Sequence, residues 1–183
     1  MNTRRTANET FTSAPPRRTP WVGVLVGALV LGLIGGTWWS RSGGEAGGMG
    51  QTFPNQGQEH IAVGAQHAAY NSFPATSGWH YAQPQPWGTF VYEIAPEALV
   101  HNLEHGGVVI QYNPSLLKQD VGQLEAIQRR FPNKTVVAPN SQLKVPLALT
   151  AWRRLYTLDT LDEPNIVEFI ERYKNRAPER FPD

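Results

Sequence analysis

The sequence predicts an α+β protein, with a single compact domain in which a mixed β-sheet is packed by two longer helices, preceded by a single transmembrane helix. An uncharged apolar run occupies residues 21–39. Short β-branched runs at 108–113 and 135–138 are typical of buried strands. Apolar residues recur at helical spacing over 115–131 and again after Pro164. Strands and helices that alternate irregularly in this way favour a layered α+β arrangement.

The first predicted element is the transmembrane helix over residues 21–39, WVGVLVGALVLGLIGGTWW. At 1.5 Å per residue this run spans about 28 Å, which matches the hydrocarbon thickness of a bilayer. Trp21 at one end and Trp38 and Trp39 at the other suit the two membrane interfaces. A cleaved signal peptide is the alternative, but the length and the tryptophans favour an uncleaved anchor.

The charge distribution predicts the orientation of this anchor. Four arginines and one glutamate give residues 1–20 a net charge of +3, so the remaining residues carry −2 of the total of +1. The positive-inside rule places the N-terminus in the cytoplasm and the C-terminal domain outside, in a single-pass protein of the cell membrane. The mildly acidic body argues against nucleic acid as a partner, because phosphate contacts need a basic face.

Composition divides the chain into four segments. Residues 1–20 form a cytoplasmic tail and residues 21–39 the anchor. Residues 40–58, rich in glycine and glutamine, are expected to be a flexible linker. Residues 59–183 form the extracytoplasmic α+β domain.

The elements of that domain are predicted in order. Residues 59–94 mix proline, glycine and aromatic residues without a sustained period, which predicts a loop that wraps the core. Pro96 can start a helix and Gly106 can end it, giving a short helix over 96–105. The run 108–113 is the first buried strand.

The second half of the domain follows the same logic. A helix is expected over 115–131, capped by Asn113 or Ser115. The run 135–138 predicts a second buried strand and 147–158 a longer one. Pro164 opens the final helix.

Cysteine is absent from the chain. Disulfides, thiolate metal sites and cysteine nucleophiles are therefore excluded. Met49 is the only methionine after the first residue, so a thioether cluster for Cu⁺ is excluded as well.

The five histidines are clustered. They all lie between residues 60 and 105, and no lysine or arginine occurs between Ala46 and Leu117. Imidazoles and carboxylates without a competing cation suit a bound divalent metal. Chance clustering, with the histidines serving packing and hydrogen bonds, is the alternative interpretation.

The stretch HNLEH, residues 101–105, sharpens the metal interpretation. His101 and His105 are neighbours on a helix and can reach one ion, while Leu99, Val100 and Leu103 share the opposite, core-facing arc. Glu104 lies near the helix C-terminus, where a carboxylate is disfavoured by about 0.3–1 kcal/mol. It therefore needs a cation, a ligand role or a hydrogen-bond donor nearby.

HNLEH also has the order of the inverted zinc-protease motif H-x-x-E-H. In a zinc hydrolase Glu104 would be the general base, but the helix is short and nothing in the sequence marks a third ligand. The catalytic residues are therefore unknown, with Glu104 a candidate only if the protein is a hydrolase. We favour a role without catalysis.

A second candidate segment is PATSGWHY, residues 74–81. Its serine and glycine can form a turn that presents His80. Trp79, Tyr81 and Trp87 could line a binding surface for a cell-envelope polymer or a protein partner. The alternative is that these aromatic residues belong to the core.

The two segments PATSGWHY and VHNLEHGGVVIQYNP together resemble a family of bacterial, often membrane-anchored proteins catalogued as domain of unknown function 3105. The resemblance covers about residues 60–175, and it departs from the family pattern at Ala75, where a second proline is usual, and at His67, which lies outside it. It implies no activity. It implies that the motifs are built around five positions: His60, His80, His101, Glu104 and His105.

We therefore expect one divalent metal ion, Zn²⁺ or Cu²⁺, because neutral imidazoles without thiolates favour these ions over Cu⁺. The expected ligands are His80, His101 and His105, with His60 or Glu104 completing the shell. No organic cofactor is indicated. A metal-free binding module for an envelope polymer or a protein partner is the alternative function.

Overall fold

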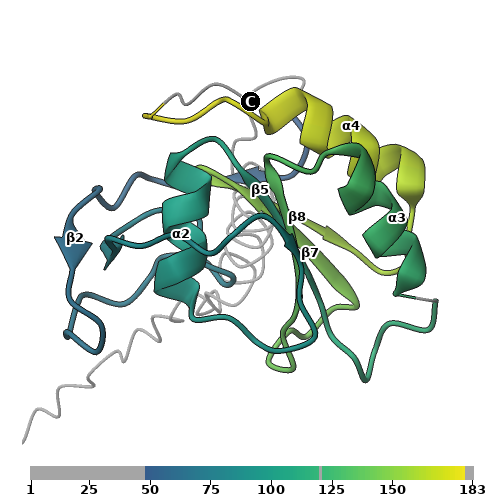
Figure 1. The fold of residues 1–183 in the computed structure, drawn as a ribbon, viewed down its shortest axis with the longest axis horizontal. Helices are drawn as coiled ribbons and strands as arrows, with labels where there is room; N and C mark the ends of the chain where they lie inside the picture. Colours follow the sequence, from purple (N-terminus) through teal and green to yellow (C-terminus); the bar gives the residue numbers. More distant parts are fainter. Residues whose placement is uncertain (1–47, 120, 180–183) are drawn as a thin grey trace, which may run out of the picture. The chain divides into compact units, whose positions relative to one another are not determined.

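The structure, a computed structural model, describes residues 48–119 and 121–179, which fall in one compact unit. Six of its strands form one sheet in the order β1-β8-β7-β5-β6-β4, and β2 and β3 form a separate pair. Figure 1 shows β2 apart from the sheet strands β5, β7 and β8. The strands are β1 (Gln51–Thr52), β2 (His60–Ile61), β3 (His80–Tyr81), β4 (Gly88–Thr89), β5 (Val108–Tyr112), β6 (Thr135–Pro139), β7 (Leu147–Ala151) and β8 (Arg154–Leu158).

The sheet is mixed, as the sequence predicts. β6 lies between β4 and β5 and is parallel to both. β5 is antiparallel to β7, β7 to β8, and β8 to β1. A parallel pair needs a crossover connection, and the helix α3 (Gly122–Arg130) supplies it between β5 and β6.

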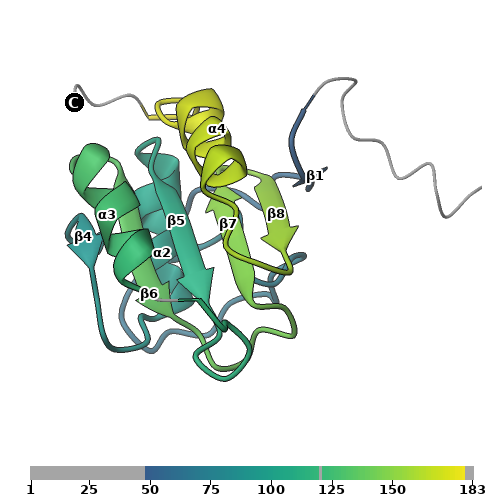
Figure 2. The same cartoon turned by 90° about the vertical axis from the view of Figure 1, so that its right-hand side faces the viewer.

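Three helices cover the sheet in the described part of the chain: α2 (Pro96–Glu104), α3 and α4 (Glu163–Tyr173). α3 and α4 lie on one face and α2 lies on the other (Figure 2). The alternation of side chains along β5 divides the core accordingly. Val108 and Ile110 pack with α3 and α4, whereas Val109 packs with α2.

The predicted helix over 115–131 is wrong in its first half. Asn113 Oδ1 accepts a hydrogen bond from the Ser115 amide at 2.8 Å, and residues 114–116 form a turn, with no helix over 117–119. Such an asparagine stabilises a turn in place of a helix start. α3 therefore begins only at Gly122.

The predicted strand over 147–158 is two strands, β7 and β8, joined by a tight turn at Trp152 and Arg153. Arg153, the second residue of the turn, adopts a φ of 62°, the left-handed conformation that a type II turn needs at that position. Because neither turn residue is glycine or asparagine, the sequence gives no sign of the reversal.

The folded part begins earlier than residue 59. β1 pairs with β8, and the Phe53 amide donates to the Arg153 carbonyl at 2.9 Å. Residues 51–58, expected in the flexible linker, are thus part of the fold. The predicted transmembrane segment 21–39 lies outside the described residues, and within those residues no helix has the length and apolar character to cross a bilayer.

Candidate metal site

The helix α2 buries both of its sides. Leu99, Val100 and Leu103 pack toward the sheet, as predicted. Its polar side is also covered, with only 4% of His101 and 1% of Glu104 exposed. The segment from Gln58 to Tyr81 lies against it. HNLEH is therefore no ordinary solvated helix face, since fully buried charged groups are rare unless they are paired.

Two further histidines reach this side of α2 from β2 and β3. These strands pair in parallel with His60 opposite His80, so the two side chains lie on the same face of the pair. Their ring centroids are 4.9 Å apart. His80 is fully buried, whereas 46% of the His60 side chain is exposed.

Together these elements form one group of candidate ligands: His60, His80, His101 and Glu104. One ligand atom from each residue lies within 4.8 Å of all the others. The shortest approach is 2.9 Å between His80 Nε2 and Glu104 Oε2, and His60 Nε2 lies 3.5 Å from the same oxygen. The group joins residues separated by more than forty positions in the chain.

Hydrogen bonds from outside the group orient its members. His80 Nδ1 donates to the Gly78 carbonyl at 2.8 Å, and His101 Nδ1 donates to the Tyr81 carbonyl at 2.6 Å. With Nδ1 held in this way, Nε2 is the atom that each ring has left to bind a metal. A backbone carbonyl on the second ring nitrogen is the usual arrangement around metal-binding histidines.

Glu104 is held in its ionised form. Burial by itself would raise its pKa, but the hydrogen bond from Gln58 and the charge and hydrogen bond of His80 outweigh it, so the pKa is lowered. Gln58 Nε2 donates to Oε1 at 2.9 Å. A carboxylate at this end of a helix is expected to need a cation, a ligand role or a hydrogen-bond donor, and Gln58 is such a donor.

The two histidines of HNLEH are held in their neutral form. Burial lowers the pKa of His101 and of His105, because it disfavours the charged imidazolium. Neutral imidazole is the form that binds a metal. The lowered pKa values of Glu104 and His101 leave the group with a carboxylate and at least one neutral imidazole, and both suit a divalent cation.

The chain matches the family described as Protein of unknown function (DUF3105) over residues 62–182. It belongs to the DUF3105 family. No curated protein and no solved structure shows significant similarity to it. The predicted family is therefore confirmed, and the function of this DUF3105 chain has to be argued from its own residues.

His105 of the DUF3105 chain lies beside the four-residue group and outside it. Its ring centroid is 4.3 Å from that of His101, but its Nε2 lies 3.1 Å from Glu179 Oε2. Glu104, His105 and Glu179 form a second, smaller cluster of possible ligands. Lys134 Nζ donates to the His105 carbonyl at 3.0 Å, and this cation disfavours a metal there.

The other candidate residues are dispersed. His67 pairs with Glu97 at 3.1 Å, away from the four-residue group. Trp79 is 44% exposed, and Tyr81 lies half-buried on β3. Trp87 packs into the core on the α2 side, so a structural role accounts for it.

Two residues of the site escape sequence reasoning. Gln58, which donates to Glu104, lies in residues 40–58, which the composition predicts to be a flexible linker. Glu179 pairs with His105 because the chain after α4 returns along HNLEHG, where the Asn175 amide donates to the Gly106 carbonyl at 2.8 Å. A long-range contact of this kind leaves no local pattern in the sequence.

Proposed function

We propose that this DUF3105 chain binds one divalent transition metal ion through His60, His80, His101 and Glu104. The observation that carries the proposal is the pair of carbonyl contacts on His80 and His101. They fix both rings with Nε2 as the binding atom, beside a buried, ionised carboxylate. Packing alone gives no reason to bring three imidazoles together around one buried carboxylate.

Zn²⁺ and Cu²⁺ are the ions that this set favours. Imidazole nitrogen suits both, and the absence of cysteine and of a methionine cluster disfavours Cu⁺. A tetrahedral zinc shell with ligand bonds of about 2.0–2.1 Å places its ligand atoms about 3.4 Å apart. The group is close to this spacing, so movements of about 1 Å would complete the shell.

Four protein ligands favour a structural or transport role over catalysis. A catalytic zinc keeps three protein ligands and one position for water, whereas a structural site is closed by four. A hydrolase with Glu104 as the general base would need Glu104 outside the shell. His60 is the exposed member of the group, so an ion can enter or leave the site past its ring.

The cellular setting is a proposal from the sequence alone. The uncharged run 21–39 and the arginines before it support a single-pass anchor with the metal-binding domain outside the cell membrane. There the domain would meet ions of the cell envelope.

Thermal melting of the full chain tests the proposal. Zn²⁺ is expected to raise the Tm and a chelator to lower it, because an ion that binds only the folded state stabilises that state. His80→Gln should abolish the zinc effect. The matched control is His67→Gln, which removes a histidine outside the group and should keep the effect. A Tm that neither zinc nor chelator changes would refute metal binding.

A further inference from the structure

A second site lies on the same face of the sheet as α2, at the opposite end of this helix from the metal ligands. It is a pocket of about 330 Å³ beside Pro96, the first residue of α2. Ligand pockets begin at about this size. None of the four proposed metal ligands lines it, so it is independent of the metal proposal.

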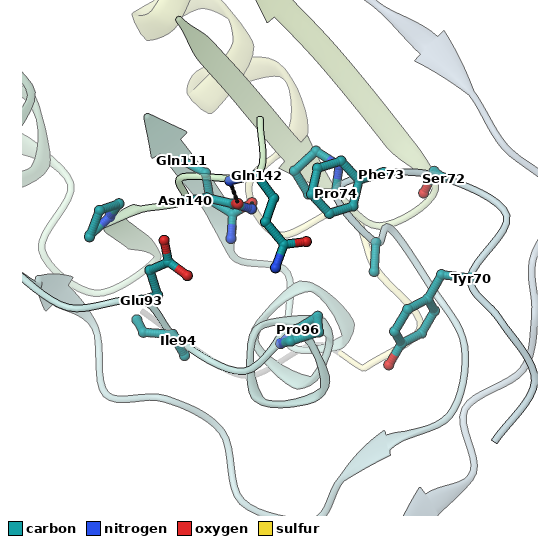
Figure 3. Close-up of a pocket in the computed structure, with 12 residues that line it drawn as sticks. Tyr70, Ser72, Phe73, Pro74, Glu93, Ile94, Pro96, Gln111, Asn140 and Gln142 are labelled. Carbon is teal, nitrogen blue, oxygen red and sulfur yellow. Dashed lines mark hydrogen bonds between the residues drawn. The ribbon is translucent and has the colours of Figure 1, made fainter. Parts of the chain in front are cut away.

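The sheet places this pocket where ligands are usually found. Its floor is formed by Gln111, near the end of β5, and by Pro139 and Asn140, at the end of the parallel strand β6. In open sheets with parallel strands, ligands bind outside the carboxyl ends of those strands. Figure 3 shows Glu93 on one side of the pocket, Phe73, Pro74 and Tyr70 on the other side, and Gln142 between them.

Gln111 is the polar group that offers the pocket a hydrogen-bond donor. Its side chain is almost completely buried, with 4% exposed. Its Oε1 accepts a hydrogen bond from Asn140 Nδ2 at 3.1 Å (Figure 3), whereas no described residue accepts from its Nε2. This nitrogen is therefore a donor available to the pocket, and a ligand that offers an acceptor can bond to it.

The charges of the lining disfavour anions. No lysine, arginine or histidine lines the pocket. The one charged group is Glu93, which accepts a hydrogen bond from the Ser141 amide at 2.7 Å. This bonding to Ser141 lowers the pKa of Glu93, so a carboxylate faces the ligand. An anionic ligand would meet this negative charge with no cation to offset it.

The two polar walls also argue against a simple amine. Glu93 can accept from a ligand and the Gln111 amide can donate to it, whereas an ammonium group has no acceptor and can bond only to Glu93. A hydroxyl group both donates and accepts. The exposed Gln142 amide can do both as well. Opposite them, Phe73, Pro74 and Pro96 offer apolar surface for the carbon face of a ring.

We propose that this pocket binds a neutral, hydroxyl-rich ring, namely a saccharide, with Gln111 and Gln142 donating to it and Glu93 accepting from it. The saccharide is either a free sugar or one residue of an envelope polysaccharide. The open rim beside Phe73, which is 54% exposed, leaves room for a chain to continue.

Saturation-transfer NMR on the full chain, in a detergent without a sugar head group, tests this proposal. The probes are glucose, N-acetylglucosamine and the β-1,4-linked trimer of N-acetylglucosamine, with benzylamine as a cationic ring and inorganic phosphate as an anion. Saturation transfer to at least one saccharide is expected. Transfer to a single sugar indicates a free ligand, and transfer to the trimer alone indicates a polymer residue.

Variants locate the binding. Gln111→Met should weaken saccharide binding by about 5- to 100-fold, the range for an unmade hydrogen bond. Gln142→Ala guards against misfolding, because this side chain is exposed, and it should weaken binding in the same direction. Gln123→Ala, an exposed glutamine on α3, should leave binding unchanged.

Three results would overturn the saccharide proposal. They are no transfer to any saccharide, transfer to benzylamine or phosphate in its place, and saccharide binding that the two pocket variants leave unchanged. The same measurement with a chelator separates the two sites. Saccharide binding should persist after the metal is removed, whichever way the metal proposal is decided.

Discussion

Glu104 is the residue whose role most sharply separates the interpretations of this site. Glu104→Gln keeps the shape of the side chain and removes its charge. If Glu104 binds the metal, zinc affinity should fall by more than about 10-fold, which is the lower range for outer hydrogen-bond partners. Isothermal titration with Zn²⁺ measures this change.

The matched control for this substitution lies on the same helix. Glu97→Gln removes a carboxylate that pairs with His67, outside the four-residue group, and should leave zinc affinity unchanged. Full zinc affinity in Glu104→Gln would place Glu104 outside the shell. That result would favour the hydrolase interpretation, in which Glu104 is the general base.

Single side chains also set the pH dependence. The folded-state pKa values of His101 and Glu104 are both lowered, so the unfolded chain takes up their protons at higher pH than the folded chain does. The stability that these groups contribute is complete above about pH 6.5, the ordinary value for histidine. It falls as the pH drops toward the folded-state values.

The affinity for the metal should also fall as the pH drops, because protons compete with the ion for the imidazoles. Chemical denaturation of the metal-free chain between pH 7.5 and pH 4 measures the first effect, and zinc titration over the same range measures the second. Stability that rises as the pH is lowered from 7 to 5 would contradict the assignment of neutral, buried imidazoles.

At the scale of elements, the turn before β3 positions the site. Gly78 has a φ of 125°, and a Cβ there would lie 2.9 Å from the ring of Tyr70. The Gly78 carbonyl also accepts the hydrogen bond from His80 Nδ1. Gly78→Ala should therefore cost about 1–3 kcal/mol of unfolding free energy and weaken zinc binding as well.

Gly64 offers the control for this element. It has a φ of 81°, but a Cβ there would meet nothing within 4 Å. Gly64→Ala thus carries the backbone strain without the clash, and it should cost less than Gly78→Ala and leave zinc binding intact. Urea denaturation of both variants gives the comparison. Equal losses in the two would show that the Tyr70 contact does not hold the turn.

The elements also show where local pattern is informative. Val108 to Tyr112 and Thr135 to Pro139 are fully buried strands, and their β-branched runs predict them. α2 ends at Glu104 because Gly106 takes a φ of 77°, and the glycine predicts that end. The chain reversal at Arg153 could not be predicted from the sequence. It is part of the hairpin between β7 and β8, and its residues are not of the types that favour turns.

For the whole molecule, the predictable part of the site is its set of residue types, and the unpredictable part is its assembly. The motifs point to His60, His80, His101 and Glu104, but helical spacing pairs His101 with His105. The structure keeps these two rings as neighbours, with centroids 4.3 Å apart, but it also places His101 with two histidines from the parallel pair β2 and β3. No periodicity within one element can show a pairing between segments twenty residues apart.

The central claim for the whole molecule is one divalent ion held by His60, His80, His101 and Glu104. Elemental analysis of the full chain, after reconstitution with Zn²⁺ or Cu²⁺ and removal of excess ion, tests it most directly. The account predicts about one ion per chain in the natural sequence and in His105→Gln, and almost none in His80→Gln. Less than about 0.2 ions per chain in the natural sequence, or one ion retained in His80→Gln, would contradict it.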